Sequence, residues 1–395
     1  MIYLDNAATT YPKPRAVRIA VQRALVRYGA NPGRAGHAMA IASSEEVYRC
    51  RCEAADFFNA PGPECVAFTL NCTSAVNFVL KGLLHAGDHV VVSCLEHNAV
   101  MRPLHALAAS GVTWTEARVF PGDNDRTVAA FREALRDNTK LVFCTHASNV
   151  WGIRLPVERI AALARQYGVP TAVDCAQSAG LLPIDMADSG IDYLCAAGHK
   201  GLYGPMGTGM LITPHGGELA TLVEGGTGTE SLSQEQPSGM PERFESGTVN
   251  MPGIAGLRAG IDFVRCTGRS HILEHEISLL RSLYAGLSAT DGVELYTPMP
   301  DPRWCAPVLS FNLRGMASEE VGRALGACGI AVRAGLHCAP SAHRFYGTLE
   351  RGAVRICPSA FSTQTDMRTL LAAVRQILMK KSRKKALNLS KDMVK

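Results

Sequence analysis

The stretch from residue 171 to 200, TAVDCAQSAGLLPIDMADSGIDYLCAAGHK, decides the fold class of this 395-residue chain. It contains two short apolar runs, Thr171-Ala172-Val173 and Tyr193-Leu194-Cys195. In both runs apolar residues follow one another without alternating with polar ones, which indicates strands buried on both faces of a sheet. The sequence therefore predicts an α/β protein with a mostly parallel sheet covered by helices.

The same pattern extends to both sides of this stretch. Further apolar runs predict strands at 90–92, 141–144 and 210–212. Apolar positions at helical spacing predict helices at 14–28, 98–109, 126–137 and 156–167. One more helix is expected to start at Ser43-Ser44-Glu45-Glu46, which has a good N-cap residue and early acids.

Residues 215–252 break this pattern with Gly, Ser, Thr, Glu and Pro, and a segment of that length favours a functional or mobile role. A new helix–strand series begins after Pro252. A chain of 395 residues exceeds the usual size of one hydrophobic core. The prediction is a large domain at 15–252, a smaller domain formed by 1–14 and 253–378, and a basic tail at 379–395.

The composition is that of an ordinary globular protein, with 47% hydrophobic and 19% charged residues. No apolar run is long enough to span a bilayer and no signal-peptide layout is present, so no membrane partner and a cytoplasmic location are expected. Much of the net charge of +5 lies in Lys380-Lys381-Ser382-Arg383-Lys384-Lys385. This run predicts a solvated, frayed C-terminus, with nucleic-acid binding the less favoured alternative.

Thirteen cysteines suggest first a disulfide framework and then a metal site. The chain is long and carries no export signal, which disfavours disulfides. Cys50 and Cys52 have C-x-C spacing, but no second C-x-x-C pair exists to complete a zinc site. No metal is expected.

Polar residues follow two of the predicted strands, where open α/β sheets bind ligands. Asp174 and Gln177 follow the strand at 171–173, and the next strand leads into Ala197-Gly198-His199-Lys200 and a glycine-rich stretch. A lysine here could contact a nucleotide phosphate, but the G-x-x-x-x-G-K-[ST] motif is absent. It could instead form an imine with a cofactor whose ring nitrogen is protonated by a nearby acid, and Asp174 supplies that acid.

Asp174-x-x-Gln177 followed by Gly198-His199-Lys200 resembles the fold-type I pyridoxal 5'-phosphate (PLP) enzymes of the class V aminotransferase superfamily. More narrowly it is similar to cysteine desulfurases and selenocysteine lyases. The resemblance extends from Tyr3-Leu4-Asp5-Asn6-Ala7-Ala8 to about residue 370. It implies a large domain with a mostly parallel seven-stranded sheet between helices, and a smaller α+β C-terminal domain.

The resemblance also implies roles for individual residues. Lys200 would hold PLP as an imine and move the Cα proton of the substrate, while Asp174 keeps the ring nitrogen protonated. Gln177 would hydrogen-bond the phenolic oxygen of the ring, and His97 would stack on the ring and relay protons. The residues expected on the substrate side are Asn149, which also lies beside the cofactor, Arg355 as the carboxylate clamp, Arg333 and Ala8.

The phosphate contacts implied by the resemblance are Cys72, Thr73 and His199, together with Thr248 from a second subunit. That last contact implies a homodimer with shared active sites. The family usually has Thr where this chain has Cys72 and Ser where it has Ala197, so two phosphate-binding hydroxyls are missing. We expect PLP to bind, but more loosely.

Cys338 lies in Arg333-Ala334-Gly335-Leu336-His337-Cys338-Ala339-Pro340, a loop-like segment between Gly and Pro. Nearby Arg333 or His337 is expected to help lower the pKa of this thiol, because a thiolate is the working nucleophile. The segment resembles the Arg-x-Gly-x-His-Cys-Ala signature of the second group of desulfurases. In that group the cysteine accepts sulfur as a persulfide and alanine is released.

Each of these residues also has an ordinary structural interpretation. Alone, Lys200 could be a surface lysine, Asp174 a helix cap, His97 a loop histidine, Arg355 a surface ion-pair partner and Cys338 a buried thiol. Their occurrence together favours an enzyme that converts L-cysteine to L-alanine and passes sulfur to an acceptor protein. The alternatives are delivery of selenium from L-selenocysteine, PLP chemistry that bypasses Cys338, and a non-catalytic PLP-binding scaffold.

Overall fold

The computed structural model describes residues 1–33 and 36–392. Its larger sheet has seven strands in the order β2-β8-β7-β6-β5-β3-β4, all parallel neighbours except β8, which is antiparallel to β2 and β7. The strands are β2 (Val66–Thr69), β3 (His89–Ser93), β4 (Thr113–Ala117), β5 (Thr139–Thr145), β6 (Thr171–Asp174), β7 (Tyr193–Ala197) and β8 (Gly209–Ile212). The predicted α/β class and mostly parallel seven-stranded sheet are confirmed.

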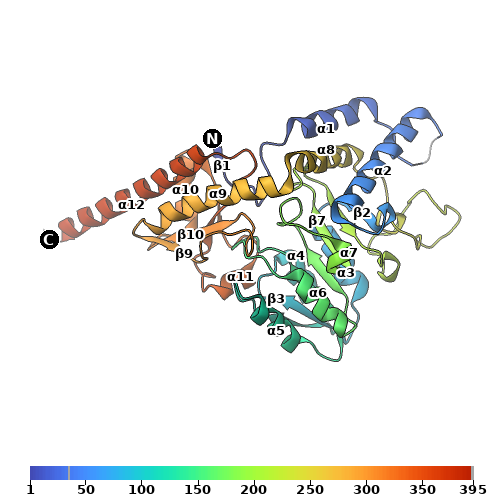
Figure 1. Ribbon diagram of the computed structural model, residues 1–395, viewed down its shortest axis with the longest axis horizontal. Coiled ribbons are helices and arrows are strands. Elements are labelled where there is room, and N and C mark those ends of the chain that lie inside the picture. Colours follow the sequence, from blue (N-terminus) through green and yellow to red (C-terminus); the bar gives the residue numbers. More distant parts are fainter. Residues whose placement is uncertain (34–35, 393–395) are drawn as a thin grey trace.

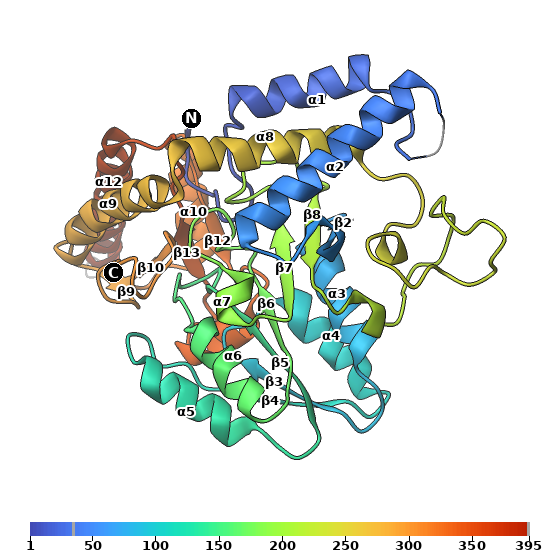
Figure 2. The ribbon, with the colours of Figure 1, turned by 45° about the vertical axis from the view of Figure 1, so that its right-hand side comes forward.

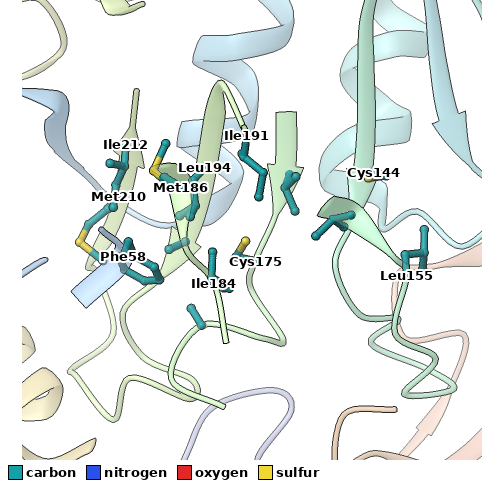
Figure 3. Packing of buried hydrophobic residues seen from close by; sticks show 14 of the residues in the cluster. Phe58, Cys144, Leu155, Cys175, Ile184, Met186, Ile191, Leu194, Met210 and Ile212 are labelled. Atoms are coloured by element: carbon teal, nitrogen blue, oxygen red, sulfur yellow. The ribbon is translucent and has the colours of Figure 1, made fainter. Parts of the chain in front are cut away.

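Successive residues of the central strands enter two different hydrophobic layers. On β7, Leu194 joins the layer that contains Phe58, whereas Tyr193 and Cys195 join the layer on the opposite face. Figure 3 shows the first layer, with Leu194 and Met210 of neighbouring strands close to Phe58. Because both faces are covered, the strands need apolar residues at every position, which explains the continuous runs in the sequence.

Helices cover both faces of this sheet (Figure 2). Those of the first part of the chain are α1 (Arg15–Arg27), α2 (Ala38–Phe58), α3 (Cys72–Leu83), α4 (Asn98–Ala108), α5 (Asn124–Ala134), α6 (Val157–Gln166) and α7 (Met186–Ser189). The predicted start of a helix at Ser43 is wrong, because α2 begins at Ala38. The Nδ1 atom of His37 accepts a hydrogen bond from the Ala40 N–H and caps the helix there, a role seldom filled by histidine.

The C-terminal part of the chain forms a second sheet of four strands in the order β12-β13-β10-β9, next to a two-stranded pair, β1-β11. The strands are β1 (Ile2–Tyr3), β9 (Val293–Leu295), β10 (Leu309–Leu313), β11 (Ile330–Ala331), β12 (Arg333–Gly335) and β13 (Ala353–Ile356). The helices are α8 (Met251–Thr267), α9 (Arg269–Ser288), α10 (Ser318–Ala327), α11 (Pro340–Phe345) and α12 (Gln364–Asp392). The N-terminal strand β1 thus lies in the C-terminal part of the fold (Figure 1).

The basic tail differs from the frayed segment that its charge predicts. It is helical as far as Asp392, the last part of the long helix α12 that leads away from the body in Figure 1. Lys, Arg, Ala and Leu dominate this run, and all four have high helix propensity. The final residues, 393–395, lie outside the described part of the chain.

Between β8 and α8 the chain forms only two short 3₁₀ turns, η2 (Gly216–Glu218) and η3 (Glu242–Phe244), as the irregular composition of this segment predicts. Helix α8 then packs against α1 and α2 and contributes Ile254 and Leu257 to the core of the larger sheet. The division into domains at residue 252 stays a prediction. Within residues 1–33 and 36–392, we find no helix that combines the length and the apolar character needed to span a membrane.

Candidate functional site

A cavity of about 80 Å³ lies where β5, β6 and β7 end, at the carboxyl edge of the larger sheet. Eight of the residues that the sequence predicts for the cofactor line it: Cys72, Thr73, His97, Asn149, Asp174, Gln177, His199 and Lys200. The same cavity is lined by Asn71 and Thr145, which the sequence analysis did not single out. Residues from three strand ends and two helix starts thus meet around the lysine.

Asp174 is buried at the end of β6. One of its carboxylate oxygens accepts hydrogen bonds from the protein, and the other is available to a ligand. Its Oδ1 accepts hydrogen bonds from the Ala176 N–H at 2.8 Å and from the Cys72 thiol at 3.3 Å. Its Oδ2 accepts none from any residue that the structure describes. The thiol of Cys72 therefore faces the carboxylate, which leaves the backbone N–H of this residue for the expected phosphate contact.

The loop that carries Lys200 is held by the N-terminal segment. The Thr10 hydroxyl donates to the Lys200 carbonyl at 3.1 Å, and the Lys13 ammonium donates to the His199 carbonyl at 2.7 Å. Burial lowers the pKa of Lys200, while Asp174 acts in the opposite direction. A lysine with a lowered pKa has a larger neutral fraction, which is the form that attacks an aldehyde.

His97 forms the N-cap of α4 and stands at the wall of the cavity. Its Nδ1 accepts a hydrogen bond from the Ala99 N–H at 2.9 Å, so Nε2 carries the proton of the neutral ring. Burial lowers its pKa to about 4, so the ring is neutral at physiological pH. A neutral, apolar-faced ring is suited to stacking on an aromatic cofactor.

The start of α3 provides an anion site at one end of the cavity. Asn71 caps this helix by accepting the Ser74 N–H at 2.9 Å, and the N–H groups of Cys72 and Thr73 have no acceptor in the described part of the chain. The Nδ1 atom of His199 is buried and also lacks a partner there. Free N–H groups at a helix N-terminus together with an imidazole fit a phosphate.

Arg355 lies beside the cavity and reaches it through Asn149. Its Nη1 donates to the Asn149 carbonyl at 2.9 Å, its Nη2 pairs with Asp5 Oδ1 at 2.8 Å, and its Nε is buried without a partner among the described residues. Asn149 has a buried free atom as well, Oδ1. Arg333 lies directly opposite Arg355 in the antiparallel pair β12–β13.

Cys338 is exposed on the loop between β12 and α11. It lines an open cavity of about 370 Å³ next to the lysine cavity, and the two cavities share His97 and Thr73 as wall residues. Both His337 and Cys338 have positive φ, 50° and 57°, which is uncommon for residues with a side chain. Hydrogen bonds from Asn149 Nδ2 to the His337 carbonyl and from the Asn98 N–H to the Cys338 carbonyl, both 2.7 Å, hold this backbone.

His337 does not assist the Cys338 thiol in the way that the sequence predicts. Its ring is turned into the core, with Nε2 2.9 Å from the Ala353 carbonyl, and burial lowers its pKa to about 2. A neutral ring directed away from the thiol supplies no positive charge that would stabilise a thiolate.

Residues 2–370 match the family model described as Aminotransferase class-V. This chain belongs to the class-V aminotransferase family. It is 34% identical to a protein named probable cysteine desulfurase from Methanothermobacter thermautotrophicus, over 95% of this chain and 94% of that relative. It is 36% identical to a protein named cysteine desulfurase from Synechococcus elongatus, over 95% of this chain and 60% of that longer relative. The apo structure of the cysteine desulfurase from Thermococcus onnurineus NA1 matches with a TM-score of 0.89 at 29% identity, covering 96% of this chain and 95% of that chain.

Members of the class-V aminotransferase family use PLP, so the predicted cofactor and the predicted enzyme class are confirmed. The side chains present fit this group. The free Oδ2 of Asp174 suits a protonated ring nitrogen, the α3 N-terminus and His199 suit a phosphate, and Lys200 suits the aldehyde. Gln177 lines the cavity, but its Nε2 donates to the Ala7 carbonyl at 3.0 Å.

Two further predicted residues, Thr248 and Ala8, do not line the lysine cavity of their own chain. Thr248 is exposed and lines a separate cavity of about 420 Å³, together with Thr73 and Phe244. Ala8 is half-buried in the N-terminal segment and donates its N–H to the Asp5 carbonyl at 3.0 Å. Neither residue contacts the cavity within one chain.

The N-terminal segment is the part of the site that the sequence analysis missed. Asp5, Thr10 and Lys13 each bond to a residue predicted for the site or to its loop. The one signal in the sequence is an acidic residue directly after the short apolar run Ile2-Tyr3-Leu4. Nothing in the spacing indicates that residue 5 pairs with residue 355.

Proposed function

We propose that this protein is a PLP-dependent cysteine desulfurase that converts L-cysteine to L-alanine and accepts the sulfur on Cys338 as a persulfide. The observation that carries the proposal is the shared wall of the two cavities. His97 and Thr73 border both the lysine cavity and the opening in which Cys338 lies. A substrate held at Lys200 therefore has a nearby exposed thiol toward which its sulfur can leave.

When bound, PLP supplies an electron-accepting ring that makes removal of the Cα proton feasible. Arg355 and Asn149 orient the substrate carboxylate, and Asp174 keeps the ring nitrogen protonated through its free oxygen. Lys200, whose pKa is lowered by burial, removes the Cα proton and returns a proton to the substrate carbon. The neutral ring of His97 lines both the lysine cavity and the opening in which Cys338 lies.

The sulfur transfer balances without an external oxidant. The thiolate of Cys338 attacks the substrate sulfur, so an S–S bond forms while the C–S bond of the substrate breaks. The electron pair of that bond stays with the substrate carbon, which takes up a proton and becomes the methyl group of alanine. Cys338 is oxidised to the persulfide and the substrate carbon is reduced.

Replacing Cys338 with serine tests the proposal. Cys338→Ser should bind PLP normally, form no persulfide and lose at least about 100-fold in alanine formation from L-cysteine, because serine cannot accept the sulfur. Alanine is quantified by amino-acid analysis and the persulfide by mass spectrometry of the peptide. Cys328→Ser, at another exposed cysteine, is the matched control and should behave like the wild type. Unchanged alanine or sulfide production by Cys338→Ser would favour PLP chemistry that bypasses this residue.

The proposed reaction allows either sulfur or selenium as the leaving atom of the substrate. Both L-cysteine and L-selenocysteine fit a mechanism in which the chalcogen leaves from Cβ, so turnover of both amino acids by the purified enzyme decides between desulfurase and selenocysteine lyase activity. An acceptor protein would remove sulfur or selenium from the exposed Cys338.

We further propose a cytoplasmic homodimer, in which Thr248 contacts the phosphate bound by the second copy. Thr248 lies outside the lysine cavity of its own chain, which supports this arrangement.

A further inference from the structure

The guanidinium of Arg355 is already paired with a carboxylate of the protein. Arg355 is only 2% exposed, and Asp5 Oδ1 lies 2.8 Å from its Nη2. The Asn149 carbonyl occupies Nη1 at 2.9 Å. The third nitrogen, Nε, is buried without a partner among the described residues. A substrate carboxylate that binds here therefore contacts an arginine whose positive charge is already partly neutralised by Asp5.

A second arginine faces the first one across the sheet. Arg333 on β12 and Arg355 on β13 are direct partners in an antiparallel ladder, so their side chains leave the same face of the sheet. Arg333 is half-buried and forms no ion pair with any residue that the structure describes. Like charges directly opposite each other destabilise a sheet unless a counter-charge is present, and Asp5 is that counter-charge.

We infer that Asp5 is a specificity-determining residue that adjusts this end of the site to a single carboxylate. Two arginines and one aspartate leave a net charge of +1, which matches the one carboxylate of a neutral amino acid. The inference rests on the proposed function, because it takes Arg355 as the residue that binds the substrate carboxylate. Asp5 acts through Arg355 and does not itself contact the substrate.

The charge balance predicts the direction of change for two opposite variants. Asp5→Asn keeps an oxygen acceptor for Nη2 but removes the negative charge, so the site gains affinity for anionic ligands. Arg333→Gln removes a positive charge, so the affinity of the site for anionic ligands falls. A ligand with two carboxylates responds more than a ligand with one, because each carboxylate interacts with the changed charge.

The experiment measures the dissociation constants of L-alanine and L-aspartate for the PLP-loaded enzyme, followed by the absorbance of the bound cofactor. Neither ligand carries sulfur, so binding is separated from sulfur transfer. The ratio of the L-aspartate to the L-alanine dissociation constant should fall about tenfold in Asp5→Asn and rise about tenfold in Arg333→Gln. Glu294→Gln is the matched control, because Glu294 pairs with Arg351 at 2.5 Å on the same sheet away from the cavity. It should leave the ratio unchanged.

Opposite shifts of the ratio in the two variants support the inference. A ratio that stays within twofold of the wild type in Asp5→Asn, or a proportional loss of affinity for both ligands, overturns it, since a purely structural role weakens both alike. If Asp5→Asn does not fold, the ratio in Arg333→Gln decides. A wild type that binds L-alanine but forms no alanine from L-cysteine contradicts the proposed function alone.

Discussion

Asp174 depends on the thiol of Cys72 for one of its two hydrogen bonds. Burial raises the pKa of Cys72 well above its ordinary value, with Asp174 adding to the effect, so the thiol stays protonated and acts as a donor. A thiol is a weak donor compared with a hydroxyl. The carboxylate proposed to contact the ring nitrogen is therefore held on one side by a weak donor.

Cys72→Ala should weaken PLP binding two- to tenfold, because it removes one hydrogen bond of roughly 0.5–1.5 kcal/mol from Asp174. The dissociation constant of PLP is measured by equilibrium dialysis. Cys195→Ala is the control, since Cys195 is fully buried on β7 but does not line the cavity. Equal PLP affinity in wild type and Cys72→Ala would show that the thiol does not support the carboxylate.

We expect His146 to make the stability of the protein depend on pH. It is fully buried beside the site, and neither ring nitrogen has a partner among the described residues. Burial lowers its pKa to about 3, with Arg154 as a second cause. The unfolded chain therefore binds a proton at this ring at a higher pH than the native state does, so its contribution to stability is complete above about pH 6.5 and is lost as the pH falls toward 3.

His146→Leu should flatten the pH dependence of stability. Between pH 6 and pH 4 the wild type should lose up to about 1.4 kcal/mol of unfolding free energy per pH unit more than the variant. Urea denaturation at a series of pH values measures this difference. His105→Leu, at an exposed position of α4, should run parallel to the wild type. Parallel curves for His146→Leu and wild type would mean that His146 does not control acid stability.

At the scale of elements, the irregular segment between β8 and α8 is held by a buried ion pair. Arg51 of α2 and Glu245 form two hydrogen bonds of 2.8 Å, and their side chains are 8% and 9% exposed. Glu245 also accepts the Phe68 N–H of β2 at 2.7 Å. This pair positions the part of the segment that leads to Thr248.

Glu245→Ala should destabilise the protein by about 3–5 kcal/mol, because it leaves the buried guanidinium of Arg51 unpaired. The exposed pair Arg49–Glu45 on the same helix is the control, with side chains 61% and 58% exposed. Glu45→Ala should cost no more than about 1 kcal/mol. Both values come from urea denaturation. A similar small loss in the two variants would contradict the assigned role of the buried pair.

The sequence predicts elements better than their connections. Continuous apolar runs placed β3, β5, β6, β7 and β8 within two residues, because a strand buried on both faces leaves a strong local signal. The start of α2 was missed because an imidazole caps it. Lys200 and Asp174 follow neighbouring strands, so their proximity was predictable, whereas the pairing of Asp5 with Arg355 depends on tertiary structure alone.

At the scale of the whole molecule, the two ends of the chain contribute unequally to the hydrophobic core. Leu4 is fully buried in the core of the C-terminal sheet, and Asp5 pairs with Arg355. On α12, the buried side chains that the structure describes all lie at or before Ile377. The beginning of the chain is therefore part of the core, while the basic end of α12 extends beyond it.

Deletion of residues 1–8 should lower the unfolding free energy by at least about 3 kcal/mol, because it empties the Leu4 position and leaves Arg355 unpaired. Deletion of residues 384–395 should change the melting temperature by less than about 2 °C. Thermal unfolding of the PLP-loaded proteins measures both. Equal tolerance of the two deletions would contradict this asymmetry.

The pairing across 350 positions also sets an order of events during synthesis. A ribosome that has made two thirds of the chain has already produced Lys200 and Asp174, yet Cys338 and Arg355 are still to come. An incomplete chain of that length therefore lacks Arg355, the partner of Asp5. The N-terminal residues that pack in the C-terminal sheet can therefore reach their final positions only when translation is nearly finished.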